Sequence, residues 1–264
     1  MHHGGVPHPT VVLLHGQPDT SASFWGLRQA LARRLPSGVR VAVPDRPGYG
    51  ANPLHATDYA GNVTWLMRWL DKVDAGPAVV LGHSWAGGVA ALAAADSRHS
   101  RIAGLVLMAS VGPGCLVPID PVLGAPVVGE LLAYTMLGLG GAAVTRKAAS
   151  VFQALLPVDE QPFAWASGAA MKARPMWRSF RVEQRALLAD LPDITRALPR
   201  ISVPTQIITG RQDHIIPDRT PQALAAAIPQ STLVRMDGAH DLQLRQPTES
   251  AERIAGFAAD LLGH

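Results

Sequence analysis

Short apolar segments alternate with segments of helical periodicity along most of this 264-residue chain. The apolar segments are almost continuously hydrophobic and rich in β-branched side chains, as is typical of parallel strands covered by helices on both faces. Because crossovers between such strands are right-handed, the pattern predicts an α/β fold with a doubly wound, mostly parallel sheet. The expected strands cover 10–16, 39–45, 78–84, 102–110, 205–210 and 231–238, and the expected helices 23–35, 58–73, 85–97, 218–228 and 248–262.

The alternation stops between Val111 and Leu198, where helical segments follow one another without strands. An insertion of this size between two strands is most simply a cap over the carboxyl edge of the sheet. We therefore expect a core domain made of residues 1–112 and 197–264, with a helical cap made of residues 113–196.

The first half of the expected cap is strongly apolar. Residues 122–144 include a single charged side chain, Glu130. A segment of this length could span a bilayer, but Pro126 and several glycines make it a poor membrane helix. We interpret it as an apolar lid that lines a pocket.

Composition limits the partners that the chain can have. The net charge is only +3, and the basic residues do not cluster as they do on a nucleic-acid-binding face, so we expect no nucleic-acid partner. Cys115 is the only cysteine, which excludes an internal disulfide and permits a reducing compartment. Residues 1–9 contain no apolar stretch of signal-peptide length, so we expect a cytoplasmic protein.

The stretch GHSWAGG (82–88) places a serine, Ser84, between an expected strand and an expected helix. A sharp turn there exposes the hydroxyl to a substrate carbonyl, but it also strains the backbone and crowds its neighbours. Gly82 and Ala86, two residues before and after the serine, are small enough to relieve that crowding. The pattern predicts a nucleophile at Ser84, with an ordinary turn that happens to contain serine as the alternative.

A nucleophilic serine needs a histidine as base, and the histidine needs a carboxylate to orient it. Asp213 follows the expected strand 205–210, and His240 follows the expected strand 231–238. Since the carboxyl ends of parallel strands meet at one edge of the sheet, we expect these side chains to converge with Ser84. The alternatives are His15, His83 and His214 for the base, and Asp190, Asp193 and Asp237 for the carboxylate.

The order Ser84, Asp213, His240 and the motifs around these residues resemble the α/β-hydrolase fold, in particular its capped serine hydrolases: esterases, lactonases and carbon–carbon bond hydrolases. One departure is Ala86, where the family usually has glycine. Another is the start of the chain, because the family normally has two further strands before the first strand expected here. The sheet is therefore expected to be shortened at this edge, or the sequence begins late. A monomer and a homodimer both stay open, and an exposed strand edge is a reason to consider the dimer. The motifs are HGQPDT (15–20), DRPGYG (45–50), GHSWAGG (82–88), GRQDHIIP (210–217) and GAHDLQLRQP (238–247).

The resemblance implies how the site would work. Ser84 would attack an acyl carbon to form an acyl-enzyme, with the backbone N–H groups of Gln17 and Trp85 as the oxyanion hole. This chemistry needs no metal and no organic cofactor. The expected substrate is a carboxylic ester, lactone or thioester with a hydrophobic part. Carbon–carbon hydrolysis, cofactor-free haloperoxidase or perhydrolase activity, and a non-catalytic ligand-binding role are the alternatives.

The residues that would contact the substrate are less specified by the sequence. A stripe of arginines, Arg178, Arg181 and Arg185, follows helical spacing within the expected cap. We interpret it as a solvated face partly neutralised by Glu183, with Trp177, Phe180 and Leu187 toward the other side of the helix. Attraction of acidic substrates or an anionic membrane surface is the alternative. The expected pocket residues are Phe24, Trp25, Leu132, Met136, Trp165 and Trp177.

Overall fold

The computed structural model describes residues 7–96, 101–139 and 176–263. Its strands form one sheet in the order β2-β1-β3-β4-β5-β6, and every neighbouring pair is parallel. This confirms the predicted α/β fold. The short strand β2 forms one edge of the sheet and β6 the other. The strands are β1 (His8–Leu14), β2 (Arg40–Ala42), β3 (Ala75–His83), β4 (Ile102–Met108), β5 (Thr205–Gly210) and β6 (Ser231–Met236).

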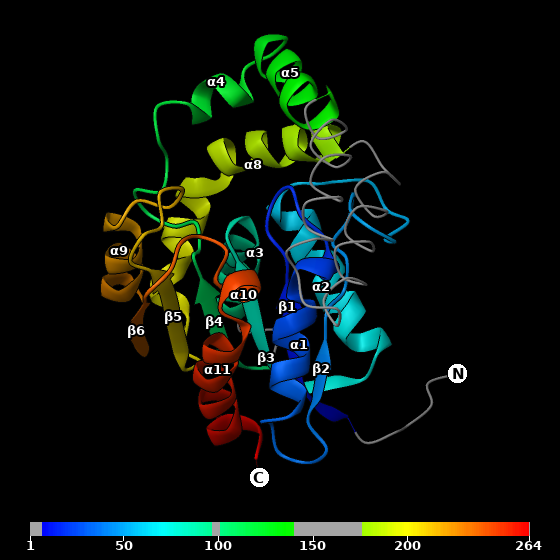
Figure 1. Cartoon of the computed structure of the whole chain (residues 1–264), viewed down its shortest axis with the longest axis vertical. Helices are drawn as coiled ribbons and strands as arrows, with labels where there is room; N and C mark the ends of the chain where they lie inside the picture. Colours follow the sequence, from blue (N-terminus) through cyan, green and yellow to red (C-terminus); the bar gives the residue numbers. More distant parts are fainter. Residues whose placement is uncertain (1–6, 97–100, 140–175, 264) are drawn as a thin grey trace, which may run out of the picture.

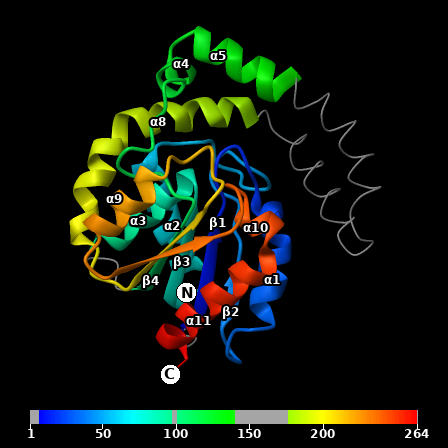
Figure 2. The same ribbon diagram turned by 60° about the vertical axis from the view of Figure 1, so that its left-hand side comes forward.

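Helices cover both faces of the sheet, as predicted (Figure 2). Alternate strand residues point to opposite sides: Val11 and Leu13 lie in one core cluster, while Val12 and Leu14 lie in the other. The first cluster packs against α1 (Trp25–Ala32) and α11 (Pro247–Leu262). The second packs against α2 (Tyr59–Lys72), α3 (Trp85–Ala94) and α9 (Arg219–Ala227). Two short elements were not predicted as separate helices, η1 (Ser21–Phe24) and α10 (Leu242–Arg245).

The remaining helices lie over the carboxyl ends of the strands (Figure 1). They fall within the expected cap. The described residues do not test the exact boundaries of the cap, and residues 140–175 of it are not among them. Among the helices described, none is long and apolar enough to cross a membrane. The elements are α4 (Asp120–Gly124), α5 (Val128–Ala133), the π-helical η2 (Tyr134–Leu139) and α8 (Met176–Ala197). The short η3 (Leu198–Arg200) follows α8 and belongs to the expected core domain, just before the start of β5.

Candidate active site

Ser84 occupies a strained turn between β3 and α3. Its φ is 53° and its ψ −121°, a conformation that a residue with a Cβ rarely adopts and that occurs at functional sites. The turn requires close approach of the two elements, because a Cβ on Gly82 would lie 2.6 Å from Gly87 Cα. The Ser84 N–H donates to the Met108 carbonyl at the end of β4 (3.0 Å). The turn thus has the strained backbone predicted from the sequence, with Ser84 itself 7% exposed; its role as a nucleophile remains a prediction.

Asp213 and His240 meet at the same edge of the sheet. His240 Nδ1–H donates to Asp213 Oδ2 at 2.9 Å, and the Asp213 side chain is only 2% exposed. The other oxygen of Asp213 accepts the N–H groups of Ile215 and Ile216 (2.8 and 2.9 Å). Burial would raise the pKa of Asp213, but the bond from His240, its charge and the two N–H donors together lower it. The carboxylate is therefore held ionised and fixed in direction.

His83 links the nucleophile turn to the loop that carries His240. Its Nε2–H donates to the His240 carbonyl at 3.1 Å, and the two imidazole rings lie 4.9 Å apart. Burial and the neighbouring His240 lower the pKa of His83 to about 3, so this imidazole stays neutral and cannot serve as a base near neutral pH. Since Ser84 follows His83 directly, the contact places the loop of His240 beside the turn of Ser84.

In the described part of the chain, the other residues considered for the base and the carboxylate do not form a histidine–aspartate pair like that of His240 and Asp213. His15 is fully buried, accepts the Arg46 N–H at Nε2 (3.0 Å) and hydrogen-bonds the Gly16 carbonyl through Nδ1 (3.0 Å). His214 is exposed, and Asp237 forms an exposed ion pair with Arg211. These positions favour Asp213 and His240, whose catalytic roles remain predictions.

The contact from His83 gives a testable expectation. Replacing His83 with Phe keeps a planar ring but removes the donor to the His240 carbonyl, and we expect kcat to fall by about tenfold because small displacements of a catalytic group are costly. His214→Ala is the matched control, in the exposed loop that follows β5, and there we expect no change. Steady-state hydrolysis of a chromogenic ester measures both. Equal activity in His83→Phe and wild type would show that this link does not position the base.

The residues of the predicted oxyanion hole lie beside Ser84. A Cβ on Gly16 would approach Ser84 Cβ to 2.9 Å, so the loop that continues to Gln17 crosses directly over the serine. Trp85 begins α3, and its N–H therefore has no intrahelical acceptor. Both side chains are bonded to α8: Gln17 Nε2 donates to Gln184 Oε1 (3.0 Å), and Trp85 Nε1 donates to the Glu183 carbonyl (2.9 Å).

A buried ion pair beneath the cap was not predicted. Arg46 and Glu183 are both fully buried and form a direct ion pair. The Tyr49 hydroxyl donates to Glu183 Oε2 (2.7 Å), while Arg46 donates to the carbonyls of His15 and Gly16 (2.7 Å each). Burial raises the pKa of Glu183 even though Arg46 and Tyr49 lower it. The pair joins α8 to the loop that follows β2, and Arg46 also binds the loop that follows β1.

The interpretation of Glu183 as part of a solvated face is therefore wrong. Residues at i, i+4 spacing along α8, Ser179, Glu183 and Leu187, are all buried, so Glu183 lies on the face that packs against the core. Trp177 and Phe180 are only partly buried. The buried side of α8 therefore differs from the side on which Trp177 and Phe180 lie.

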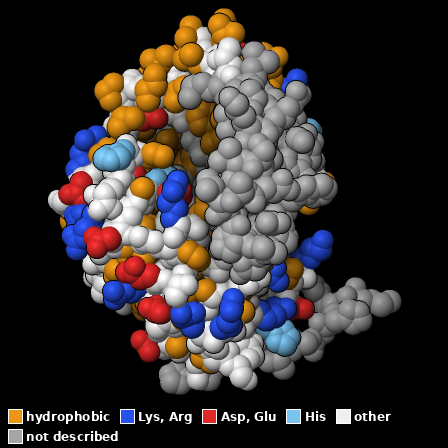
Figure 3. Space-filling model, in the orientation of Figure 1, with side chains coloured by type: hydrophobic (Ala, Val, Ile, Leu, Met, Phe, Trp, Pro, Cys, Tyr) orange, Lys and Arg blue, Asp and Glu red, His pale blue; other side chains and the backbone are white. Residues whose placement is uncertain are grey.

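Two of the three arginines of the predicted stripe bind other parts of the cap. Arg181 pairs with Glu130, and Arg185 donates to the Gly124 carbonyl (3.1 Å). Arg178 lies over the Trp177 ring, 5.2 Å from its centroid. These contacts hold α4 and α5 against α8; attraction of an anionic surface stays a prediction. On the outer surface of the cap, apolar side chains gather over α4 and α5 (Figure 3); the exposed ones include Ile119, Val122, Val127, Val128, Leu131 and Tyr134.

The predicted pocket residues have different environments. Phe24 is fully buried, with its ring edge-on to His83 at 6.3 Å. Trp25 and Leu132 are half-buried. Trp177 packs edge-on against Tyr134 at 5.6 Å. The side chain of Met136 and all of Trp165 lie outside the described part of the chain. A role in substrate binding remains a prediction for each of them.

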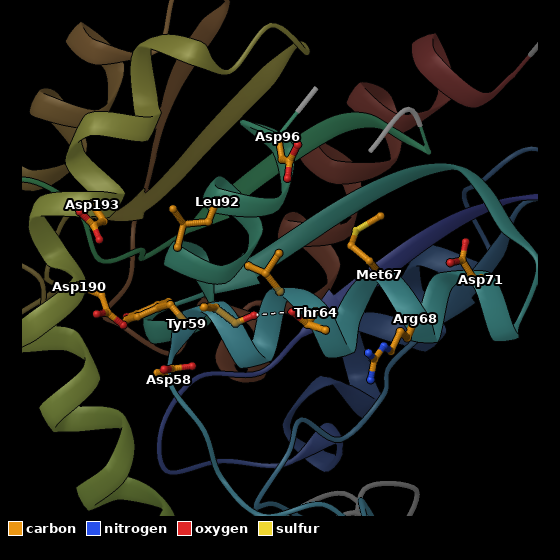
Figure 4. Close-up of a pocket in the computed structure, with 12 residues that line it drawn as sticks. Asp58, Tyr59, Thr64, Met67, Arg68, Asp71, Leu92, Asp96, Asp190 and Asp193 are labelled. Atoms are coloured by element: carbon orange, nitrogen blue, oxygen red, sulfur yellow. Dashed lines mark hydrogen bonds between the residues drawn. The ribbon is translucent and has the colours of Figure 1, made fainter. Parts of the chain in front are cut away.

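A separate cavity of about 630 Å³ lies along α2 (Figure 4). Asp190 and Asp193 of α8 line it together with Asp58 and Tyr59, and none of its lining residues belongs to the predicted site. Within residues 7–96, 101–139 and 176–263, no group of three or more His, Cys, Asp or Glu side chains could hold a metal ion.

Comparisons with known proteins agree with the fold. The chain is 26% identical to the magnesium-chelatase 30 kDa subunit of Rhodobacter capsulatus, over 98% of this chain and 88% of that protein. It is 31% identical to the pimeloyl-(acyl-carrier protein) methyl ester esterase of Aromatoleum aromaticum, over 93% and 96%. An esterase structure from Exiguobacterium antarcticum superposes with a TM-score of 0.71 at 19% identity, covering 95% of this chain and 91% of that one. The sequence profile of the alpha/beta hydrolase family matches residues 11–253, and the chain therefore belongs to that family.

Proposed function

We propose that the chain is a serine hydrolase that cleaves a carboxylic ester, lactone or thioester with a hydrophobic acyl or alcohol part. The observation that carries the proposal is the hydrogen bond between His240 and Asp213, at the same sheet edge as the strained turn of Ser84. The similarity to a relative named as a methyl ester esterase supports ester hydrolysis.

In the proposed reaction, His240 Nε2 takes the proton of the Ser84 hydroxyl as its oxygen attacks the acyl carbon. The N–H groups of Gln17 and Trp85 stabilise the negative charge on the former carbonyl oxygen. His240 then returns the proton to the leaving alcohol as the ester bond breaks. A water molecule, deprotonated by the same imidazole, cleaves the acyl-enzyme and restores Ser84. Asp213 orients the imidazole and stabilises its charged form.

The hydrophobic part of the substrate is proposed from the composition of the cap, whose residues 122–139 carry one charge, Glu130; several apolar side chains of this segment are exposed on the outer surface of the cap. Each additional buried CH₂ contributes about 0.8 kcal/mol of binding free energy. Acetate and butyrate differ by two CH₂ groups, so we expect kcat/KM for p-nitrophenyl esters to rise by about tenfold from acetate to butyrate and further to hexanoate. Initial rates across the chain-length series measure this dependence.

A fluorophosphonate that traps the nucleophile separates the proposal from its alternatives. We expect one equivalent to attach to Ser84, as peptide mass spectrometry would show, with parallel loss of ester turnover. Attachment elsewhere would contradict the assignment, and absence of both labelling and turnover would favour a ligand-binding protein. Faster cleavage of a vinylogous diketone, or peroxide-dependent bromination faster than ester turnover, would favour the other reactions.

A further inference from the structure

Consecutive residues of α8 hold the two residues that are proposed to form the oxyanion hole. The Glu183 carbonyl accepts from the Trp85 indole, and the Gln184 carboxamide accepts from the Gln17 carboxamide. We propose that Gln184 is a positioning residue for the oxyanion hole, through which the cap controls the rate of the chemical step. This inference rests on the proposed serine hydrolase function.

Gln184 is well placed to transmit the position of the cap. It is 2% exposed, and besides accepting from Gln17 it donates through Nε2 to Asp120 Oδ1 at 2.8 Å. Asp120 is the first residue of α4, and its other oxygen accepts the Val117 N–H at 2.7 Å. Hydrogen bonds therefore run from the start of α4, through α8, to the loop above Ser84.

The planar carboxamide explains why this link is directional. The Gln184 oxygen accepts from Gln17, and its nitrogen donates to Asp120. Reversal of the amide would therefore place its NH₂ group against the Gln17 donor and its oxygen against the Asp120 carboxylate. A buried polar group that loses its partner is strongly disfavoured. These contacts restrict the orientation of the Gln17 side chain, and through it the direction of the backbone N–H at the same residue.

The opposite end of the Gln17 carboxamide supports a role in positioning. Its Oε1 is buried without a hydrogen-bond partner among the described residues. Among the described residues, the Gln17 side chain therefore makes one hydrogen bond, the bond to Gln184. Loss of an oxyanion-hole donor costs about 10²–10³-fold in kcat. A donor that is displaced rather than removed should cost less, and about tenfold is the expectation.

Substitution of Gln184 by Met tests this, because Met keeps the volume and removes both hydrogen bonds. We expect kcat to fall about tenfold while KM changes by less than about twofold, since interactions made only in the transition state act on kcat. The rate of fluorophosphonate labelling should fall in parallel. Val182→Ala, at an exposed position on the same helix, is the control and should leave all three quantities unchanged.

A double-mutant cycle and a rescue distinguish positioning from general damage. Gln17→Ala should lower kcat as Gln184→Met does, and the double variant should be no slower than the slower single variant, because both remove one link. Gln184→Glu alone places two carboxylates together and should be slow. Adding Asp120→Asn supplies a donor to the new carboxylate and should restore most of kcat.

The outcomes separate this inference from the function on which it rests. Wild-type labelling at Ser84 together with an unchanged kcat in Gln184→Met would overturn the positioning role alone. Additive effects of Gln17→Ala and Gln184→Met, or no rescue by Asp120→Asn, would likewise assign the losses to general disruption. Absence of labelling and turnover in the wild type would instead overturn the proposed function.

Discussion

Substitution of Ser84 by Ala is expected to lower kcat for a p-nitrophenyl ester by about 10⁵-fold, since loss of the nucleophile of a serine hydrolase costs about 10⁶ and impurities or bound water set a floor. Alanine removes the only atom of Ser84 that would form the acyl-enzyme, whereas the fold should be unaffected. Stopped-flow and steady-state assays, with circular dichroism as a check on folding, measure the two effects separately.

The matched control is Ser110, another buried serine at the carboxyl edge of the sheet, whose hydroxyl donates to the Val111 carbonyl at 2.8 Å. Ser110→Ala should retain activity close to that of the wild type. The proposed mechanism requires that fluorophosphonate does not label the Ser84→Ala protein, whatever residual activity this variant retains. Turnover in Ser84→Ala equal to that in Ser110→Ala would assign the chemistry to another residue.

The fold could be predicted because each strand carries its own local signal. Segments such as TVVLLHG (10–16) are apolar on both faces, which only a strand between two helical layers requires. The strained turn was also predictable, since Gly82 and Ala86 are local to Ser84. Asp213 and His240 followed from the rule that parallel strands present their carboxyl ends together, and the structure places them within a hydrogen bond.

Contacts between distant segments were not predictable in the same way. Arg46 and Glu183 form a hydrogen-bonded ion pair although they are 137 positions apart in the sequence. No local sequence pattern indicates that they pair. Ser179, Glu183 and Leu187 share the buried face of α8, but two of them are polar, so their spacing gave no hydrophobic pattern to set against Trp177 and Phe180. Burial of an acidic residue is rare without a partner, so periodicity alone gave no reason to expect it.

The buried pair leads to the largest expected effect on stability. Glu183→Ala leaves the fully buried Arg46 guanidinium without its carboxylate, and we expect the free energy of unfolding to fall by about 3–5 kcal/mol. Glu183→Gln retains an acceptor and should lose less. The exposed pair of Arg34 and Glu252 provides the contrast, because Glu252→Ala should cost about 1 kcal/mol or less. Urea unfolding followed by tryptophan fluorescence measures all three; equal losses in Glu183→Ala and Glu252→Ala would refute a stabilising role for the buried pair.

Removal of the other partner should have a different dependence on pH. In Arg46→Met, Glu183 remains buried, and its pKa, already raised by burial, should rise further because the guanidinium is gone. A carboxyl can become neutral by binding a proton, whereas a guanidinium cannot.

In Arg46→Met the contribution of Glu183 to stability should therefore be most favourable below about pH 4.3, the usual pKa of glutamate, where folded and unfolded states both carry the proton. As pH rises toward the raised pKa of the folded state, the unfolded state ionises first, and the free energy of unfolding should fall. Glu183→Ala has no titrating carboxyl at this site, so its deficit relative to wild type should not grow over that range. Unfolding curves for both variants between about pH 5 and 8 test this difference, and parallel profiles would show that Glu183 in Arg46→Met finds another cation or reaches water.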